Sequence, residues 1–136
     1  MAANPVGCAA ALTALDVLVD ENLSQRSIEL GTLFRSTLKA TNLLRVQDFD
    51  GAGLFISLVL EEKTPKVTPR RIVSLLAQRG VLASPAGLRR IKVCPPLAIS
   101  REELLKGAEV VIGVMRGIEG FGELPAEVLF DVRHRG

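Results

Sequence analysis

The run Leu-Phe-Ile-Ser-Leu-Val-Leu at residues 54–60 constrains the fold of this chain more than any other feature. It is short, rich in β-branched and aromatic residues, and broken by only one polar side chain, which is typical of a central strand. A turn region is expected just before it, over residues 48–53, and residues 46–48 are a candidate pairing partner. The chain must therefore build its core on a sheet around this strand.

The Gly-Ala-Gly at residues 51–53 has two interpretations. Glycines of this spacing can cradle a phosphate, but such a loop needs a helix N-terminus directly after it. Here a strand follows, so the sequence favours a tight turn that requires positive φ angles.

Four segments have the signatures of helices. Asn4 and Pro5 suit the cap and first position of the first helix, whose apolar residues recur at helical spacing and whose many alanines predict burial on most sides. A second helix is expected after residues 20–22, with Arg35 on its water-facing side. Thr68 and Pro69 predict the start of a third helix that ends at Gly80. The apolar positions on which these assignments rest are Cys8, Leu12, Leu15, Val19, Leu23, Leu30, Leu33, Phe34, Leu38, Ile72, Leu75 and Leu76.

The fourth helix begins with a capping box, in which Ser100 and Glu103 can each satisfy a free backbone N–H. Its apolar pattern dissolves beyond Gly117. We therefore expect one domain over residues 1–117 and a loosely ordered tail over residues 118–136.

Two further short strands are expected at residues 81–83 and 90–93, with a turn at residues 85–87 between them and a stop at Pro95. The predicted fold class is α/β of the α+β type, a small antiparallel sheet of three to four strands packed with about four helices. The expected order is helix, helix, strand, helix, strand, strand, helix.

Composition excludes several classes of function. The net charge is only +2, aromatic residues make up 4%, and the basic stretch at residues 88–92 is expected to be a solvated strand edge, so we expect no nucleic-acid partner. Cys8 and Cys94 are expected to be two buried free thiols, and one His without ligand spacing predicts no metal site. No apolar stretch is long enough for a membrane span, and because no basic stretch precedes the first helix we expect no signal peptide. We expect a cytoplasmic protein, and a mitochondrial location stays open.

Four stretches resemble motifs of one enzyme family. Residues 4–11 resemble the NPLGC helix start of class III aminotransferases, and residues 51–55 resemble their G-x-G-L-F strand entry. Residues 80–85 resemble the GLLAKP strand of ornithine aminotransferases, and residues 91–104 resemble their IRFAPPLVI segment and final helix. The similarity runs over nearly the whole chain, so the sequence resembles the C-terminal small domain of this fold-type I family, which depends on pyridoxal phosphate.

The resemblance implies a chain that is not competent alone. In such enzymes the catalytic lysine and the cofactor belong to a large N-terminal domain, and no lysine here has a matching context. We therefore expect pyridoxal phosphate in the complete enzyme but none held by this chain alone, and no catalytic or cofactor-binding residue within it. The implied partner is a large-domain chain or an aminotransferase subunit, in a dimeric assembly.

The sequence departs from the family pattern at three places. Lys92 stands where the family has an arginine near the substrate carboxylate, and it keeps the charge without the planar two-point fork. It is the one candidate substrate-binding residue, the alternative being a solvated, idle lysine. Asp50 replaces an arginine, and the residues before Asn4 lack the family's threonine and two glycines.

Two functions follow from the resemblance. The chain is expected to be part of an enzyme that transfers an amino group from ornithine to a 2-oxo acid. The alternative is a non-catalytic remnant, or a module that associates with aminotransferase subunits, which the departures from the family pattern favour.

Overall fold

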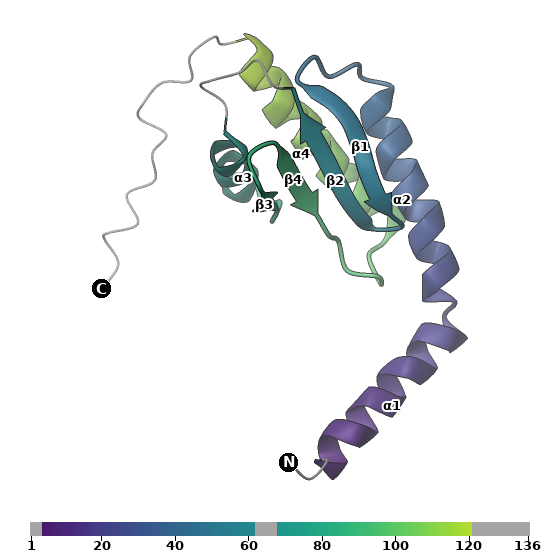
Figure 1. The fold of residues 1–136 in the computed structure, drawn as a ribbon. Coiled ribbons are helices and arrows are strands. Elements are labelled where there is room, and N and C mark those ends of the chain that lie inside the picture. Colours follow the sequence, from purple (N-terminus) through teal and green to yellow (C-terminus); the bar gives the residue numbers. More distant parts are fainter. Residues whose placement is uncertain (1–3, 62–67, 121–136) are drawn as a thin grey trace.

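The computed structural model describes residues 4–61 and 68–120, which form a small mixed domain with one projecting helix (Figure 1). The elements, in chain order, are α1 (Pro5–Asp20), α2 (Leu23–Lys39), β1 (Val46–Ala52), β2 (Phe55–Leu60), α3 (Pro69–Gln78), β3 (Ser84–Ala86), β4 (Arg90–Val93) and α4 (Arg101–Gly120). Four helices and a four-stranded antiparallel sheet confirm the predicted fold class.

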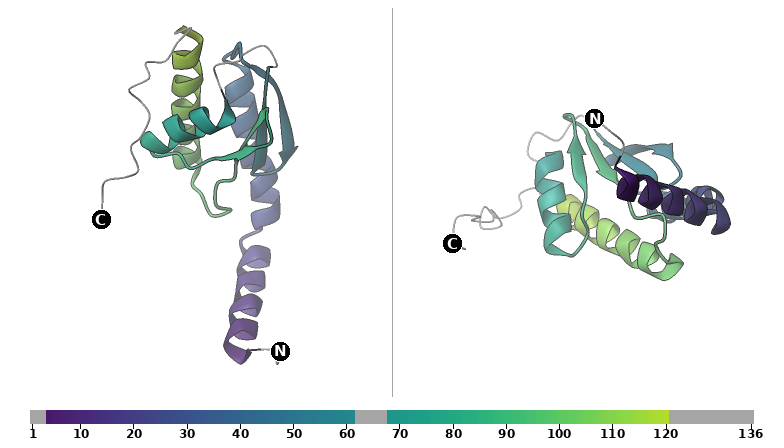
Figure 2. Two further views of the ribbon diagram at one scale, coloured as in Figure 1. Left: turned by 60° about the vertical axis from the view of Figure 1, so that its left-hand side comes forward. Right: turned by 90° about the horizontal axis from the view of Figure 1, so that it is seen from below.

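The sheet has the strand order β1-β2-β4-β3, and every neighbouring pair is antiparallel. The apolar strand β2 lies inside it, paired with β1 on one side and β4 on the other, as its composition predicts. Helices α2, α3 and α4 gather on one face of the sheet (Figure 2). The core lies between these two layers, and its most deeply buried large side chains are Phe34, Leu38, Ile56, Leu58, Ile72, Leu76, Ile91, Leu104, Val111, Val114, Met115 and Ile118.

The predicted helix caps are present. The Asn4 side chain accepts a hydrogen bond from the backbone N–H of Val6, and Thr68 accepts one from the N–H of Arg71. In the capping box, Glu103 accepts from the N–H of Ser100 at 3.0 Å, and Ser100 Oγ accepts from the N–H of Glu103 at 3.2 Å. These local signals decide where the helices begin.

The expectation that the first helix is buried on most sides is wrong for this chain. Helix α1 has no buried residue and extends away from the sheet and its helical layer (Figure 1). Leu12, Leu15 and Val19 are 63%, 58% and 71% exposed. The helical spacing of these residues is correct, but among the described elements α1 contacts only the next helix, α2.

Two strand boundaries differ from the prediction. Strand β1 continues through residues 48–52, which were expected to turn, because the connection to β2 needs only Gly53 and Leu54. The strand expected at residues 81–83 lies instead at Ser84–Ala86, so the turn shifts to residues 87–89. Strand β4 matches the prediction but lies between β2 and β3, so the basic stretch is not a sheet edge.

The expectation that both cysteines are buried is wrong, and the fourth helix ends three residues later than predicted. Cys8 and Cys94 are free thiols, but both are exposed, because Cys8 belongs to the projecting helix and Cys94 follows the last residue of β4. Helix α4 continues past Gly117 to Gly120, and the rest of the predicted tail, residues 121–136, lies outside the described residues.

Within residues 4–61 and 68–120, no helix has the length and apolar character needed to cross a membrane. The same residues contain no cluster of His, Cys, Asp and Glu side chains that could hold a metal ion.

Candidate functional site

The side of the sheet away from the core helices carries the candidate site. Alternate residues of β2 and β4 point to opposite faces of the sheet. Ile56 and Leu58 on β2, and Ile91 on β4, are buried in the core. Phe55, which is 55% exposed, and Lys92 therefore belong to the opposite, open face.

Lys92 lies near the middle of this face, in the second of the two inner strands. It is in register with Ser57 on β2 and with Ser84 on β3. Its side chain is partly buried, and its Nζ lies 5.7 Å from the centroid of the Phe55 ring, a distance at which the ring face attracts a cation. In the part of the chain that the structure describes, no carboxylate is paired with this ammonium group.

Asp50 and Arg90 form an ion pair on the same face. The Arg90 guanidinium donates to Asp50 Oδ2 at 2.6 Å, and the other carboxylate oxygen accepts from the N–H of Gly51 at 2.7 Å. These hydrogen bonds, that of Arg90 above all, lower the pKa of Asp50 from its ordinary value. Asp50 thus pairs with Arg90, whereas Lys92 on the same face has no carboxylate partner among the described residues.

The hairpin between β1 and β2 contains the glycines of the Gly-Ala-Gly segment. Gly51 has φ 103° and Gly53 has φ 53°, which is the left-handed region that favours glycine. Arg35, expected to face water, is partly buried and donates to the Gly53 carbonyl at 3.0 Å. The predicted positive φ angles are confirmed at both glycines, but the turn itself comprises Gly53 and Leu54, and the segment offers no helix N-terminus for a phosphate.

The described residues do not match the donor set of a pyridoxal phosphate site. Such a site needs a lysine that forms a Schiff base with the cofactor's aldehyde, a side chain that pairs with its ring nitrogen, and several hydrogen-bond donors for its phosphate. Lys39 and Lys92 lie over aromatic rings, and Lys106 is paired with Glu102 at 2.8 Å. None of these three lysines shares a pocket with a phosphate cradle.

The sequence identified Lys92 but not its two companions. Phe55 was assigned only to the apolar strand, although strict alternation from buried Ile56 places it on the open face. Arg90 was treated as part of a basic stretch. Its pairing with Asp50 depends on how three strands align, and no local pattern in the sequence contains that alignment.

Comparison with protein families finds a match to the model described as "Aminotransferase class-III" over residues 1–115. The chain is 38% identical over 109 residues to an ornithine aminotransferase of Emericella nidulans, covering 79% of this chain and 24% of the relative. It is 41% identical over 101 residues to an ornithine aminotransferase of Brevibacillus brevis, covering 74% of this chain and 24% of the relative.

Solved structures agree with these relatives. The ornithine aminotransferase of Toxoplasma gondii superposes with a TM-score of 0.78 at 30% identity, covering 86% of this chain and 28% of that one. The acetylornithine aminotransferase of Elizabethkingia anophelis gives a TM-score of 0.76 at 32% identity, with 84% and 29% covered. The chain therefore spans about a quarter of the length of the proteins it matches, consistent with a C-terminal piece.

Proposed function

This chain belongs to the class III aminotransferase family, and from that premise we propose that it acts as the substrate-covering small domain of an ornithine aminotransferase-like enzyme. The proposed reaction is transfer of an amino group from ornithine to a 2-oxo acid. Pyridoxal phosphate would supply the electron sink for that chemistry, and we assign it to a large domain that completes the site. The contribution of this chain is to bind and orient the substrate.

The observation that carries the proposal is the position of Lys92. A partly buried ammonium group on an open sheet face, without a carboxylate partner among the described residues, is suited to a substrate carboxylate. The Phe55 ring limits where that ammonium group can lie, and the neighbouring Arg90 forms an ion pair with Asp50. Lys92 also stands at the position of the arginine in the family motif.

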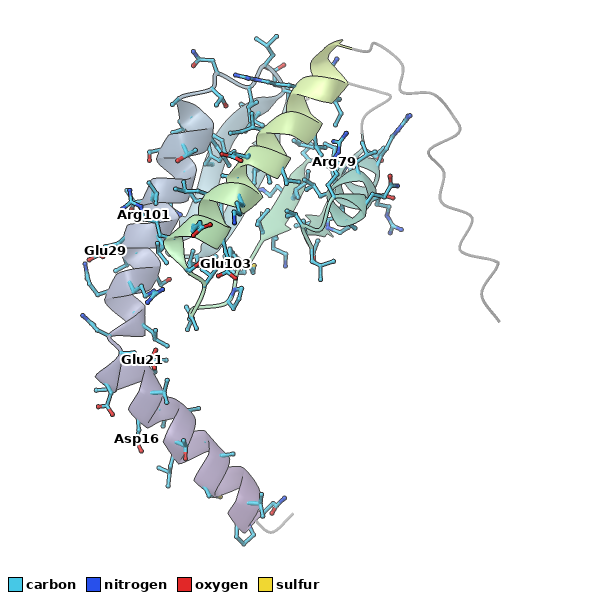
Figure 3. All side chains as sticks on the ribbon, turned by 180° about the vertical axis from the view of Figure 1, so that it is seen from behind. Asp16, Glu21, Glu29, Arg79, Arg101 and Glu103 are labelled. Atoms are coloured by element: carbon cyan, nitrogen blue, oxygen red, sulfur yellow. The ribbon has the colours of Figure 1, made fainter. Side chains whose placement is uncertain are left out.

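Helix α1 supports the part of the proposal that concerns a partner. Leu12, Leu15 and Val19 on α1 are exposed, and the only described element that α1 contacts is the next helix, α2. Figure 3 shows α1 standing apart from the rest of the domain. Large apolar patches exposed on a soluble protein mark sites of interaction with another protein, a membrane or a ligand. We propose that α1 packs against the large domain of an aminotransferase subunit, within a dimeric assembly.

Co-expression with a large domain taken from an ornithine aminotransferase relative tests the proposal. We expect a stable complex with the absorbance of bound pyridoxal phosphate and with ornithine transaminase activity. The double substitution L12S/L15S on α1 should weaken the complex, whereas I28S, which changes an exposed apolar residue of α2 (54% exposed), is the matched control. Absence of any complex with the unsubstituted chain would refute the proposal.

A non-catalytic module that associates with aminotransferase subunits is the second candidate. The observation that favours it is the Asp50–Arg90 pair, together with a lysine at position 92, which lacks the two-point fork of an arginine. It predicts that the complex forms but shows no transamination with any amino donor, and that K92R does not restore activity. Activity of the unsubstituted complex would exclude it.

A further inference from the structure

A cavity of about 530 Å³ opens on the helical side of the domain, where the end of α3, the segment after β4 and the start of α4 meet. This volume lies within the range of small-molecule sites, about 300–1,000 Å³. Its lining residues are Phe34, Arg79, Gly80, Val81, Leu82, Val93, Cys94, Pro95, Pro96, Ile99, Glu103, Leu104, Lys106, Gly107 and Val110.

The floor of the cavity is part of the hydrophobic core. Phe34 on α2, Val93 on β4 and Leu104 on α4 are all buried and belong to one hydrophobic cluster. The walls add the ring surfaces of Pro95 and Pro96. An apolar group that enters the cavity is therefore held by fixed side chains rather than by a mobile surface.

Three charged side chains line the cavity, and two of them already have partners. Glu103 accepts hydrogen bonds from both the N–H and the hydroxyl of Ser100, and Lys106 is paired with Glu102. The Arg79 guanidinium makes no hydrogen bond or ion pair with any group in residues 4–61 or 68–120. Arg79 directly follows the last residue of α3, Gln78, and Glu103 belongs to α4 (Figure 3).

We propose that this cavity binds a small monocarboxylate with a compact apolar tail. The tail lies against Phe34, Leu104 and the prolines, and the carboxylate binds the Arg79 guanidinium, whose planar fork matches two carboxylate oxygens. Charge complementarity selects an acid over an amine, because the cavity's single carboxylate is engaged in the helix cap. The proposal concerns the helical side of the domain and does not depend on the aminotransferase reaction.

The probe pair is 4-phenylbutyrate and 4-phenylbutan-1-ol, which share a tail and differ in charge. Titration of the full chain, followed by backbone amide NMR shifts, should give saturable shifts at the lining residues with 4-phenylbutyrate. The alcohol should bind about tenfold more weakly, because it cannot form the charge-assisted pair. Equal affinity for the acid and the alcohol would overturn the assignment of a carboxylate site.

Helix α4 offers a matched pair of variants that leave the charges unchanged. A Cβ at Gly107, which lines the cavity, meets nothing within 4 Å, and the same holds for Gly113, which does not line it. Both glycines lie in a helix interior, where a side chain raises helix propensity, so both leucine variants are expected to fold. Gly107→Leu should abolish binding by filling the cavity, and Gly113→Leu should not alter it.

A second pair of variants tests the charge. Arg79→Gln should weaken 4-phenylbutyrate binding about tenfold and leave binding of the alcohol unchanged. Arg70→Gln removes another exposed arginine, from the first turn of α3 and outside the cavity lining, and should change neither. The proposal fails if Gly107→Leu binds as well as the unsubstituted chain, or if the shifts follow protein concentration rather than ligand, which would indicate that a second copy covers the cavity.

Discussion

Gly31 on α2 and Gly53 in the hairpin turn lie so close that a Cβ added to Gly31 would overlap the Gly53 carbonyl oxygen. The backbone of the helix thus lies directly against the backbone of the turn. Two neighbouring hydrogen bonds hold the same contact: Arg35 donates to the Gly53 carbonyl at 3.0 Å, and the Ser27 hydroxyl accepts from the N–H of Leu54 at 3.0 Å. Position 31 therefore fixes how the β1–β2 hairpin sits on the helical layer.

Gly31→Ala should lower the free energy of unfolding by about 1–2 kcal/mol, measured by urea denaturation. The overlap involves backbone on both sides, so relief requires a shift of the helix or the hairpin, and such overpacking costs more than the gain in helix propensity. Gly113→Ala is the control, because its Cβ meets nothing within 4 Å, and it should be neutral or slightly stabilising. Equal stability of the two variants would contradict the close contact.

Asp50→Asn should reduce stability at neutral pH and lose that effect in acid. The folded pKa of Asp50 is depressed, chiefly by the Arg90 hydrogen bond, so its contribution is present above the unfolded value of about 3.9. That contribution disappears as the pH falls through the lower folded pKa. Thermal unfolding from pH 7 to pH 2 should show the two melting curves converging, and a constant gap at every pH would argue against the ion pair.

Ser100→Ala should cost about 1 kcal/mol of stability, because it removes the cap of α4. The hydroxyl is both the acceptor for the Glu103 N–H and a donor to its carboxylate at 2.6 Å. Those hydrogen bonds lower the Glu103 pKa, and in the variant its titration should move back towards the ordinary value. NMR titration of the Glu103 carboxyl measures this shift, and an unchanged pKa would contradict the geometry of the cap.

Lys92→Met, made in a complex of this chain with an aminotransferase large domain, should lower kcat/KM for the 2-oxo acid about tenfold or more. Lys92→Arg should keep or raise it, since the guanidinium keeps the charge and adds the two-point fork. The control is Lys39→Met, because Lys39 lies 5.9 Å above the Phe49 ring in the same kind of contact. If both methionine variants lose activity equally, Lys92 has no special role in substrate binding.

Much of the fold could be predicted because its signals are local. The caps at Asn4, Thr68 and Ser100 act over two or three residues, and each is present where the sequence places it. The apolar strand β2 is central because its composition suits burial on the inside of a sheet. The predicted strand boundaries were less accurate. A turn can shift by a few residues along the chain without placing any residue in a backbone conformation that it disfavours.

The candidate site shows which features the sequence predicts and which depend on the tertiary structure. The sequence by itself determined the helix starts, the central strand, the glycine turn and the identity of the cation at position 92. Only the tertiary structure decided that Phe55 lies beside Lys92, that Asp50 pairs with Arg90, and that α1 and both cysteines are exposed. The physical reason is that strand register and burial depend on which surfaces meet, and contacts between distant segments have no signature in the spacing of residues along one segment.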